Sequence, residues 1–127
     1  MDNSEEIIKY RLSRSDETFE DAIDYLKKER YTGVASRLYY SVFYAVSAYF
    51  LKKMIYSKSH SGLKSKFNEH FIKNRIIDPA KGDIYNELFD FRHDADYRDL
   101  LVMTKEDVEP LIDKANALIT EIKNLIE

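Results

Sequence analysis

The sequence predicts an all-α protein, folded as one helical bundle of about five helices. Three observations support this fold class. The chain has 127 residues but only three Gly and two Pro, roughly 4% against the usual 12% for the pair, so it has few places to turn. Its apolar residues recur at helical rather than strand spacing. No internal repeat or low-complexity linker divides residues 1–127, which predicts a single domain.

Two long helices are predicted in the first half of the chain. The first covers about Ser4–Arg30, has its apolar residues on one stripe, and has Asn3 or Ser4 as its expected N-cap. The second begins after Thr32, which can cap it, and runs to about Ile55. It is apolar nearly all round. We therefore expect it to be the central helix, covered on several sides or buried against a second copy of the protein.

A shorter third helix follows a Ser-rich linker, with Ser59 or Ser61 as its expected cap. This part of the chain is basic: from Lys52 to Arg75 there are seven basic residues and one acidic residue, although the formal net charge of the whole chain is −3. A local positive patch attracts phosphate-bearing ligands. A solvated helix face, or a surface that docks an acidic partner, would give the same pattern.

Two further helices have clear start signals. Asp78 followed by Pro79 places a carboxylate at the N-cap and proline at the first helical position, and this fourth helix is expected to reach about Asp96. Thr104 with Asp107 three residues later resembles a capping box. The fifth helix, which starts there, has the cleanest amphipathic pattern in the chain.

Composition excludes several classes of protein. The chain has no Cys, which excludes disulfide frameworks and cysteine-ligated metal centres. Its first residues lack the basic and apolar regions of a signal peptide, and its longest apolar run is far shorter than a membrane span. We expect a cytoplasmic protein that does not contact the membrane.

Arg92 is the most informative residue of the fourth helix. It lies on the apolar stripe of that helix with Leu88, and a buried arginine needs a partner. Asp96, four residues later, is the nearest candidate. Two interpretations remain open. Arg92 either forms an intrahelical ion pair that fixes the helix in the bundle, or it binds a phosphate, with Tyr97 as a hydrogen-bond donor beside it.

The second helix has a similar strip. Arg37 is followed at helical spacing by Tyr40, Ser41 and Tyr44. Six of the ten tyrosines lie between Tyr31 and Tyr56. Buried tyrosine hydroxyls need hydrogen-bond partners. These side chains either form an internal network or line a ligand groove.

The three histidines are His60 in the Ser-rich linker, His70 on an apolar helix face, and His93 directly after Arg92. A histidine such as His70 is usually a core residue with a hydrogen-bond partner. No two histidines have a metal-ligand spacing, so neither a metal site nor a cofactor is expected.

Three motifs together resemble the HEPN domains (higher eukaryotes and prokaryotes nucleotide-binding). They are residues 35–45, ASRLYYSVFYA; residues 59–62, SHSG; and residues 88–92, LFDFR, followed by Ala95-Asp96-Tyr97. The resemblance covers essentially the whole chain. It is closest to the small stand-alone bacterial and archaeal branch that ends in Arg-x-x-Ala-Asp-Tyr.

This resemblance implies an up-and-down helical bundle that commonly forms a homodimer. It also implies a place in a toxin–antitoxin or stress-response module, often beside a minimal nucleotidyltransferase. Many HEPN proteins are metal-independent ribonucleases with an Arg-x4-6-His motif at the dimer cleft. In that motif the histidine is the general acid or base, and the arginine stabilises the pentacoordinate phosphate.

The arginine of that motif corresponds to Arg92, but the positions at which the histidine is expected hold Tyr97, Arg98 and Asp99. Tyrosine, with an unperturbed pKa of about 10, is a poor general base at neutral pH. The leading hypothesis is therefore a subunit that binds a nucleotide, RNA or a nucleotidyltransferase. The predicted cleft residues are Arg37, Tyr40, Tyr44, Arg92, Asp96 and Tyr97, with His60 as a further ligand-binding candidate.

Two alternatives remain. The first is a ribonuclease toxin that uses Arg92 with Tyr97, His93 or His60. The second is a purely structural helical interaction module, in which internal hydrogen bonds use all the polar groups of the arginines and tyrosines.

Overall fold

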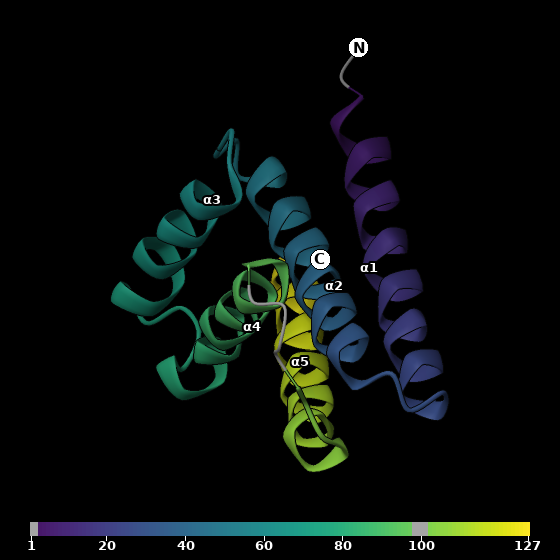
Figure 1. Ribbon diagram of the computed structural model, residues 1–127. Coiled ribbons are helices and arrows are strands. Elements are labelled where there is room, and N and C mark those ends of the chain that lie inside the picture. Colours follow the sequence, from purple (N-terminus) through teal and green to yellow (C-terminus); the bar gives the residue numbers. More distant parts are fainter. Residues whose placement is uncertain (1–2, 98–101) are drawn as a thin grey trace.

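The computed structural model describes residues 3–97 and 102–127 (Figure 1). The elements are α1 (Ser4–Lys27), α2 (Tyr31–Lys52), α3 (His60–Phe67), the π-helical segment η1 (Asn68–Lys73), α4 (Pro79–Tyr97) and α5 (Lys105–Ile126). There is no strand in these two ranges. The predicted all-α bundle is confirmed.

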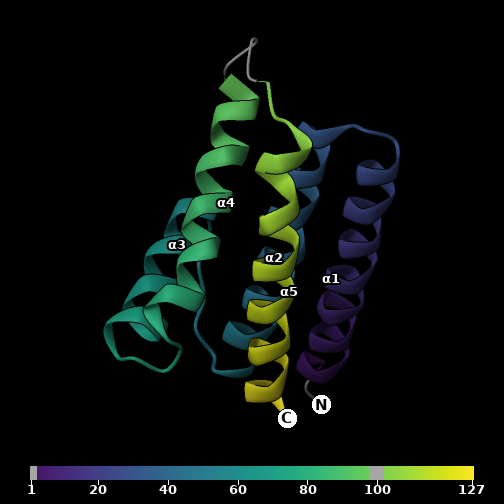
Figure 2. The same cartoon turned by 90° about the horizontal axis from the view of Figure 1, so that it is seen from below.

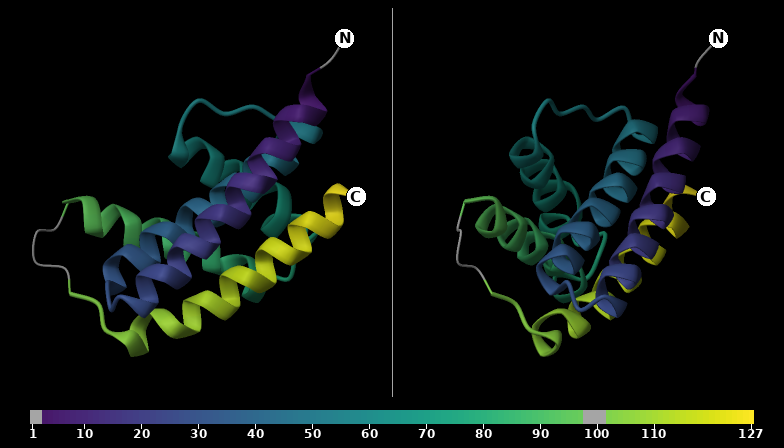
Figure 3. Two further views of the ribbon diagram at one scale, coloured as in Figure 1. Left: turned by 90° about the vertical axis from the view of Figure 1, so that its right-hand side faces the viewer. Right: turned by 45° about the vertical axis from the view of Figure 1, so that its right-hand side comes forward.

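Helix α2 is the centre of the bundle, as its composition predicts. It packs against α1, α4 and α5, and half of its 22 residues are buried. Helices α1 and α2 run alongside each other over most of their length (Figure 3). The start of α1 and the end of α5 lie at the same end of the bundle (Figure 2), where both line one cavity.

Two small polar residues join α1 to α2. Ser15 Oγ donates to the carbonyl oxygen of Ser41, and Ser41 Oγ donates to the carbonyl oxygen of Ser15, both at 2.7 Å. Both serines are completely buried. The reciprocal bonds satisfy the two hydroxyls, and the small side chains let the helix backbones approach closely.

The predicted starts of the last three helices are confirmed. Ser59 Oγ accepts a hydrogen bond from the amide of Gly62 at 3.0 Å. Asp78 Oδ1 accepts one from the amide two residues later at 2.9 Å. Thr104 and Asp107 form a complete capping box. These local signals identify the helix starts because each depends only on residues within one turn.

The expected N-cap position of the first helix is confirmed, but that of the second helix is wrong. Asn3 precedes α1, but its side chain makes no capping hydrogen bond. Helix α2 begins at Tyr31, ahead of Thr32. Its first turn lies against α1 so closely that a Cβ on Gly33 would be 2.4 Å from Cδ2 of Tyr25. The packing of this turn, rather than a side-chain cap, determines where α2 starts.

Helices α1 and α2 also end before Arg30 and Ile55, the predicted limits. Glu29 and Met54 adopt left-handed conformations, with φ of 59° and 60°. Left-handed residues of this kind commonly end helices, and they are rarely other than Gly or Asn. The sequence therefore gave no signal for these two ends.

The expected single third helix is in fact α3 followed by η1. Asn68, the first residue of η1, exchanges two side-chain amide hydrogen bonds with Asn86 of α4, at 2.9 and 2.8 Å. These bonds join residues 18 positions apart, so the periodicity of the third helix could not reveal them.

We predict that Ser41→Ala lowers the free energy of unfolding by about 0.5–1.5 kcal/mol, because a buried hydrogen bond between α1 and α2 is lost. Ser41→Leu should cost more, since the close contact has no room for two further heavy atoms. Urea unfolding of the purified variants measures both. Ser13→Ala, at an exposed position of α1, is the matched control. Equal stabilities of Ser41→Ala and wild type would contradict the importance of this contact.

Candidate functional site

Arg92 of α4 lies against two tyrosine rings of α2. Its Nε donates to Tyr40 Oη at 3.2 Å, and its guanidinium carbon is 5.5 Å from the ring centroids of both Tyr39 and Tyr40. The two rings meet edge to face, with centroids 5.1 Å apart. The cation–π contacts and the hydrogen bond fix the direction of the guanidinium plane.

His60 approaches the same two rings from α3. Its Nδ1 is 2.7 Å from Tyr39 Oη, and its ring centroid is 5.8 Å from that of Tyr39 and 6.0 Å from that of Tyr40. On another side it stacks on Phe43 at 4.5 Å. His60 is the first residue of α3, not a linker residue as expected, because Ser59 caps the helix.

The environment shifts the pKa values of this pair in opposite directions. Burial raises the pKa of Tyr39 to about 12. Burial, and then the positive charge of Arg92, lowers the pKa of His60 below its ordinary value of 6.5. The phenol therefore keeps its proton at neutral pH, and the imidazole is mainly uncharged.

A neutral imidazole can either accept a hydrogen bond from the phenol or donate one to it. The Tyr39 hydroxyl can donate to Nδ1 or accept from it, so it is compatible with both tautomers of His60. Nε2 has no hydrogen-bond partner among the described residues. This nitrogen is thus available to accept or donate a proton, and it lies within electrostatic reach of Arg92.

The sequence did not identify Tyr39 as a site residue. Its ring also stacks on Tyr85 at 5.9 Å and meets Phe89 edge to face at 6.0 Å. Tyr39 therefore connects α2, α3 and α4. Its adjacency to Tyr40 was visible in the sequence, but the convergence of three helices on its ring depends on tertiary packing.

The other predicted residues on α2 lie elsewhere. Arg37 has its guanidinium carbon 6.0 Å from the ring centroid of Tyr25, and its Nε is buried without a hydrogen-bond partner in the described ranges. The ring of Tyr44 lies 5.4 Å from the guanidinium carbon of Arg14. Of the α2 residues predicted to form the cleft, only Tyr40 contacts Arg92 among the described contacts.

Several predictions concern the end of α4. His93 is exposed. The side chains of Asp96 and Tyr97 lie outside the described residues, so the expected ion pair with Asp96 and the role of Tyr97 stay predictions. His70 has a hydrogen-bond partner, as expected: its Nε2 is 2.9 Å from Tyr49 Oη.

No three His, Asp or Glu side chains in the described ranges converge so that they could hold a metal ion. None of the described helices is both long and apolar enough to span a bilayer.

The fold and the site define a helical bundle with an arginine at the centre of an aromatic and polar cluster. The family model named HEPN domain matches residues 8–125, and the chain belongs to this family. A UPF0332 protein of Thermotoga maritima is 37% identical over 127 residues, which cover all of this chain and 96% of the relative. A Methanocaldococcus jannaschii protein named "Putative toxin MJ0142" is 31% identical over 115 residues, or 91% of this chain and 78% of the relative.

We predict that Arg92→Ala raises the pKa of His60. The nearby positive charge disfavours the imidazolium ion, so its removal lets the ring take up a proton at higher pH, while the effect of burial remains. A titration of the His60 ring protons by NMR measures the change. The expected result is a pKa below 6.5 in the wild type and an upward shift in the variant. An unchanged value would contradict the proximity of the two side chains.

Proposed function

We propose that this chain is the toxin-like HEPN subunit of a two-component module, and that it binds RNA or a nucleotide through phosphate groups at Arg92. The observation that carries this proposal is the orientation of Arg92 by Tyr39 and Tyr40. Two aromatic faces and one Nε hydrogen bond hold the guanidinium group.

An arginine held in this way suits a phosphate group. Its planar fork donates parallel hydrogen bonds to two phosphate oxygens, which a lysine ammonium group cannot do. The aromatic faces orient the cation without adding negative charge to compete with the ligand. In such a preorganised site the guanidinium needs little rearrangement when a phosphate arrives.

A lysine of α3 lies close to α4 beside the site. Lys64 Nζ lies 4.6 Å from the ring centroid of Phe89 on α4, one helical turn before Arg92, and 3.9 Å from an exposed Asp90 carboxylate. A lysine near the guanidinium adds to the attraction of polyanions, although Asp90 offsets part of its charge.

The proposed partners are a second copy of this chain and a minimal nucleotidyltransferase, in the cytoplasm. Membership of the HEPN family supports the homodimer and the two-component arrangement. The similarity to an archaeal protein named as a toxin supports the toxin-like role. Co-expression with the product of an adjacent nucleotidyltransferase gene, followed by pull-down, tests the arrangement.

We predict that Arg92→Ala weakens binding of single-stranded RNA roughly ten- to a hundredfold, the effect of losing charge-assisted hydrogen bonds. Arg92→Lys should recover only part of the affinity, because the charge returns without the bidentate geometry. Fluorescence anisotropy with a labelled oligonucleotide measures both.

The control for the loss of one charge is Lys114→Ala, at an exposed position of α5, which should bind as wild type. Circular dichroism confirms that each variant remains helical. A folded Arg92→Ala variant with wild-type affinity would refute the proposal and favour the purely structural module.

A second candidate function, a metal-independent ribonuclease, is favoured by the position of His60 beside Arg92. In this reaction His60 Nε2 takes the proton of the RNA 2′-hydroxyl while the 2′-oxygen attacks phosphorus. The bond to the 5′-oxygen breaks, and that oxygen takes a proton from water. The products are a 2′,3′-cyclic phosphate and a 5′-hydroxyl, and Arg92 stabilises the charge on the phosphorane.

For this candidate we predict that the purified protein cleaves RNA in the presence of EDTA. His60→Asn should lower the rate roughly 10²- to 10⁴-fold, because asparagine can still bond to Tyr39 but cannot transfer protons. RNA affinity should be retained, which separates catalysis from binding. Product analysis should show a cyclic phosphate end. If the wild type binds RNA but does not cleave it, the ribonuclease candidate is refuted and only the binding function remains.

A further inference from the structure

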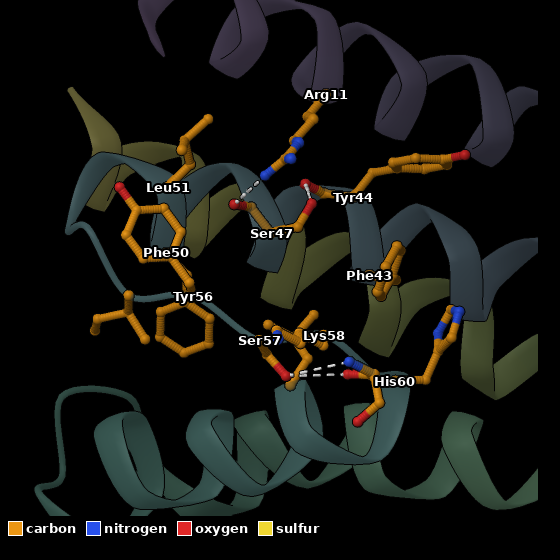
Figure 4. Close-up of a pocket in the computed structure, with 13 residues that line it drawn as sticks. Arg11, Phe43, Tyr44, Ser47, Phe50, Leu51, Tyr56, Ser57, Lys58 and His60 are labelled. Carbon is orange, nitrogen blue, oxygen red and sulfur yellow. Dashed lines mark hydrogen bonds between the residues drawn. The ribbon is translucent and has the colours of Figure 1, made fainter.

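A pocket of about 450 Å³ lies beside the Arg92 site, between α1, α2 and the segment that leads into α3 (Figure 4). Arg11 of α1 is on one side, Ser57, Lys58 and His60 are on the other, and side chains of α2 lie between them. Its volume is within the range of small-molecule sites, about 300–1,000 Å³. Tyr44 and His60, both predicted from the sequence as ligand-binding residues, contribute to its wall, whereas Arg37, Tyr40 and Arg92 do not line it.

The charge of the pocket is positive. Arg11 and Lys58 line it, and no Asp or Glu is among its lining residues. No described carboxylate lies within ion-pair distance of Arg11 or Lys58. Arg11 is held across the pocket by a hydrogen bond from Nη1 to the carbonyl oxygen of Ser47, at 3.1 Å. This arrangement favours an anionic ligand.

The pocket also offers aromatic surface. Phe43 and Tyr44 contribute from α2, and Tyr56 contributes from the linker. Tyr56 is 63% exposed, so much of its ring surface is open to a ligand. Aromatic rings beside cations are the features with which proteins bind single-stranded nucleic acids, because bases stack on the rings while cations bind the phosphates.

His60 connects this pocket to the Arg92 site. One side of its ring faces Tyr39 and Tyr40, which contact Arg92. Another side stacks on Phe43 in the pocket wall. The two sites are therefore neighbours along one surface and share a side chain.

We propose that this pocket binds a nucleotide that flanks the phosphate held by Arg92, so that the natural ligand is single-stranded RNA of more than two nucleotides. This inference rests on the proposed function. The flanking base stacks on Tyr56, and Arg11 and Lys58 bind its phosphates. Paired bases of a duplex are unavailable for such stacking, so the site selects single strands.

A larger cavity adjoins this pocket and shares Leu51 and Tyr56 with it, but it does not fit this ligand as well. It has a volume of about 520 Å³, but Glu5 lines it together with Lys9 and Lys52. The mixed charge gives no preference for a polyanion. Because Tyr56 lines both cavities, a variant of Lys9, which lines the larger cavity alone, tests whether the ligand lies there instead.

The test compares an eight-nucleotide single strand with a two-nucleotide strand, both labelled for fluorescence anisotropy. Tyr56→Ala should weaken binding of the longer strand about five- to a hundredfold, the effect of losing one stacked base. Lys58→Ala should weaken this binding as well. It should also reduce the slope of log K against log salt concentration by about one. Both side chains are exposed, so the variants should fold. Binding of the two-nucleotide strand should not change.

Lys9→Ala removes the same charge as Lys58→Ala outside the pocket, and it should leave both affinities unchanged. Tyr56→Phe should bind as wild type, because the ring remains. Loss of affinity in Arg92→Ala with wild-type affinity in both pocket variants would overturn the inference and leave the proposed function intact. No binding of either strand by the wild type would overturn both. Binding of free AMP that depends on Tyr56 but not on Arg92 would identify a separate nucleotide site and overturn the inference.

Discussion

The burial of α2 is the constraint on which the rest of the structure depends. Between Tyr31 and Leu51 this helix has a single charged side chain, Arg37, so it is stable only when other helices cover it. Helices α1, α4 and α5 provide that cover, and the paired serines bring α1 especially close. What remains partly open is the face of α2 that includes Tyr40, Phe43 and Tyr44. Both candidate sites lie on this face.

The same burial gives the site its chemistry. The guanidinium of Arg92 lies against two tyrosine rings of α2, and its positive charge acts on the neighbouring His60. Desolvation raises the pKa of Tyr39 and lowers that of His60. The excess of tyrosine in the sequence thus has a physical role, because these rings fill the core, orient a cation and still offer hydroxyl groups.

The sequence predicted those features that depend on neighbouring residues. Helical spacing located α1 to α5, and the caps at Ser59 and Thr104 were evident because each forms within one turn. It could not predict that Arg92 meets Tyr39, which is 53 positions earlier in the chain, or that α3 brings His60 to the same ring. These contacts follow from how the helices pack, and no single-helix periodicity contains that information. The prediction that Arg37 and Arg92 line the same cleft also depended on helix packing, and the structure places Arg37 against Tyr25 instead.

Because His60 lies near Arg92, the lack of a histidine at the motif positions after Arg92 does not by itself argue against proton transfer at this site. Proton transfer requires a group within reach of the reacting oxygen and a suitable pKa, and it does not require that group to follow the arginine on the same helix. Tyr97, Arg98 and Asp99 occupy the motif positions, yet an imidazole reaches the tyrosines around Arg92 from α3. A strand bound at Arg92 and continuing into the neighbouring pocket would pass this imidazole. The relevant comparison among HEPN proteins is therefore the spatial relation between arginine and histidine rather than their spacing in sequence.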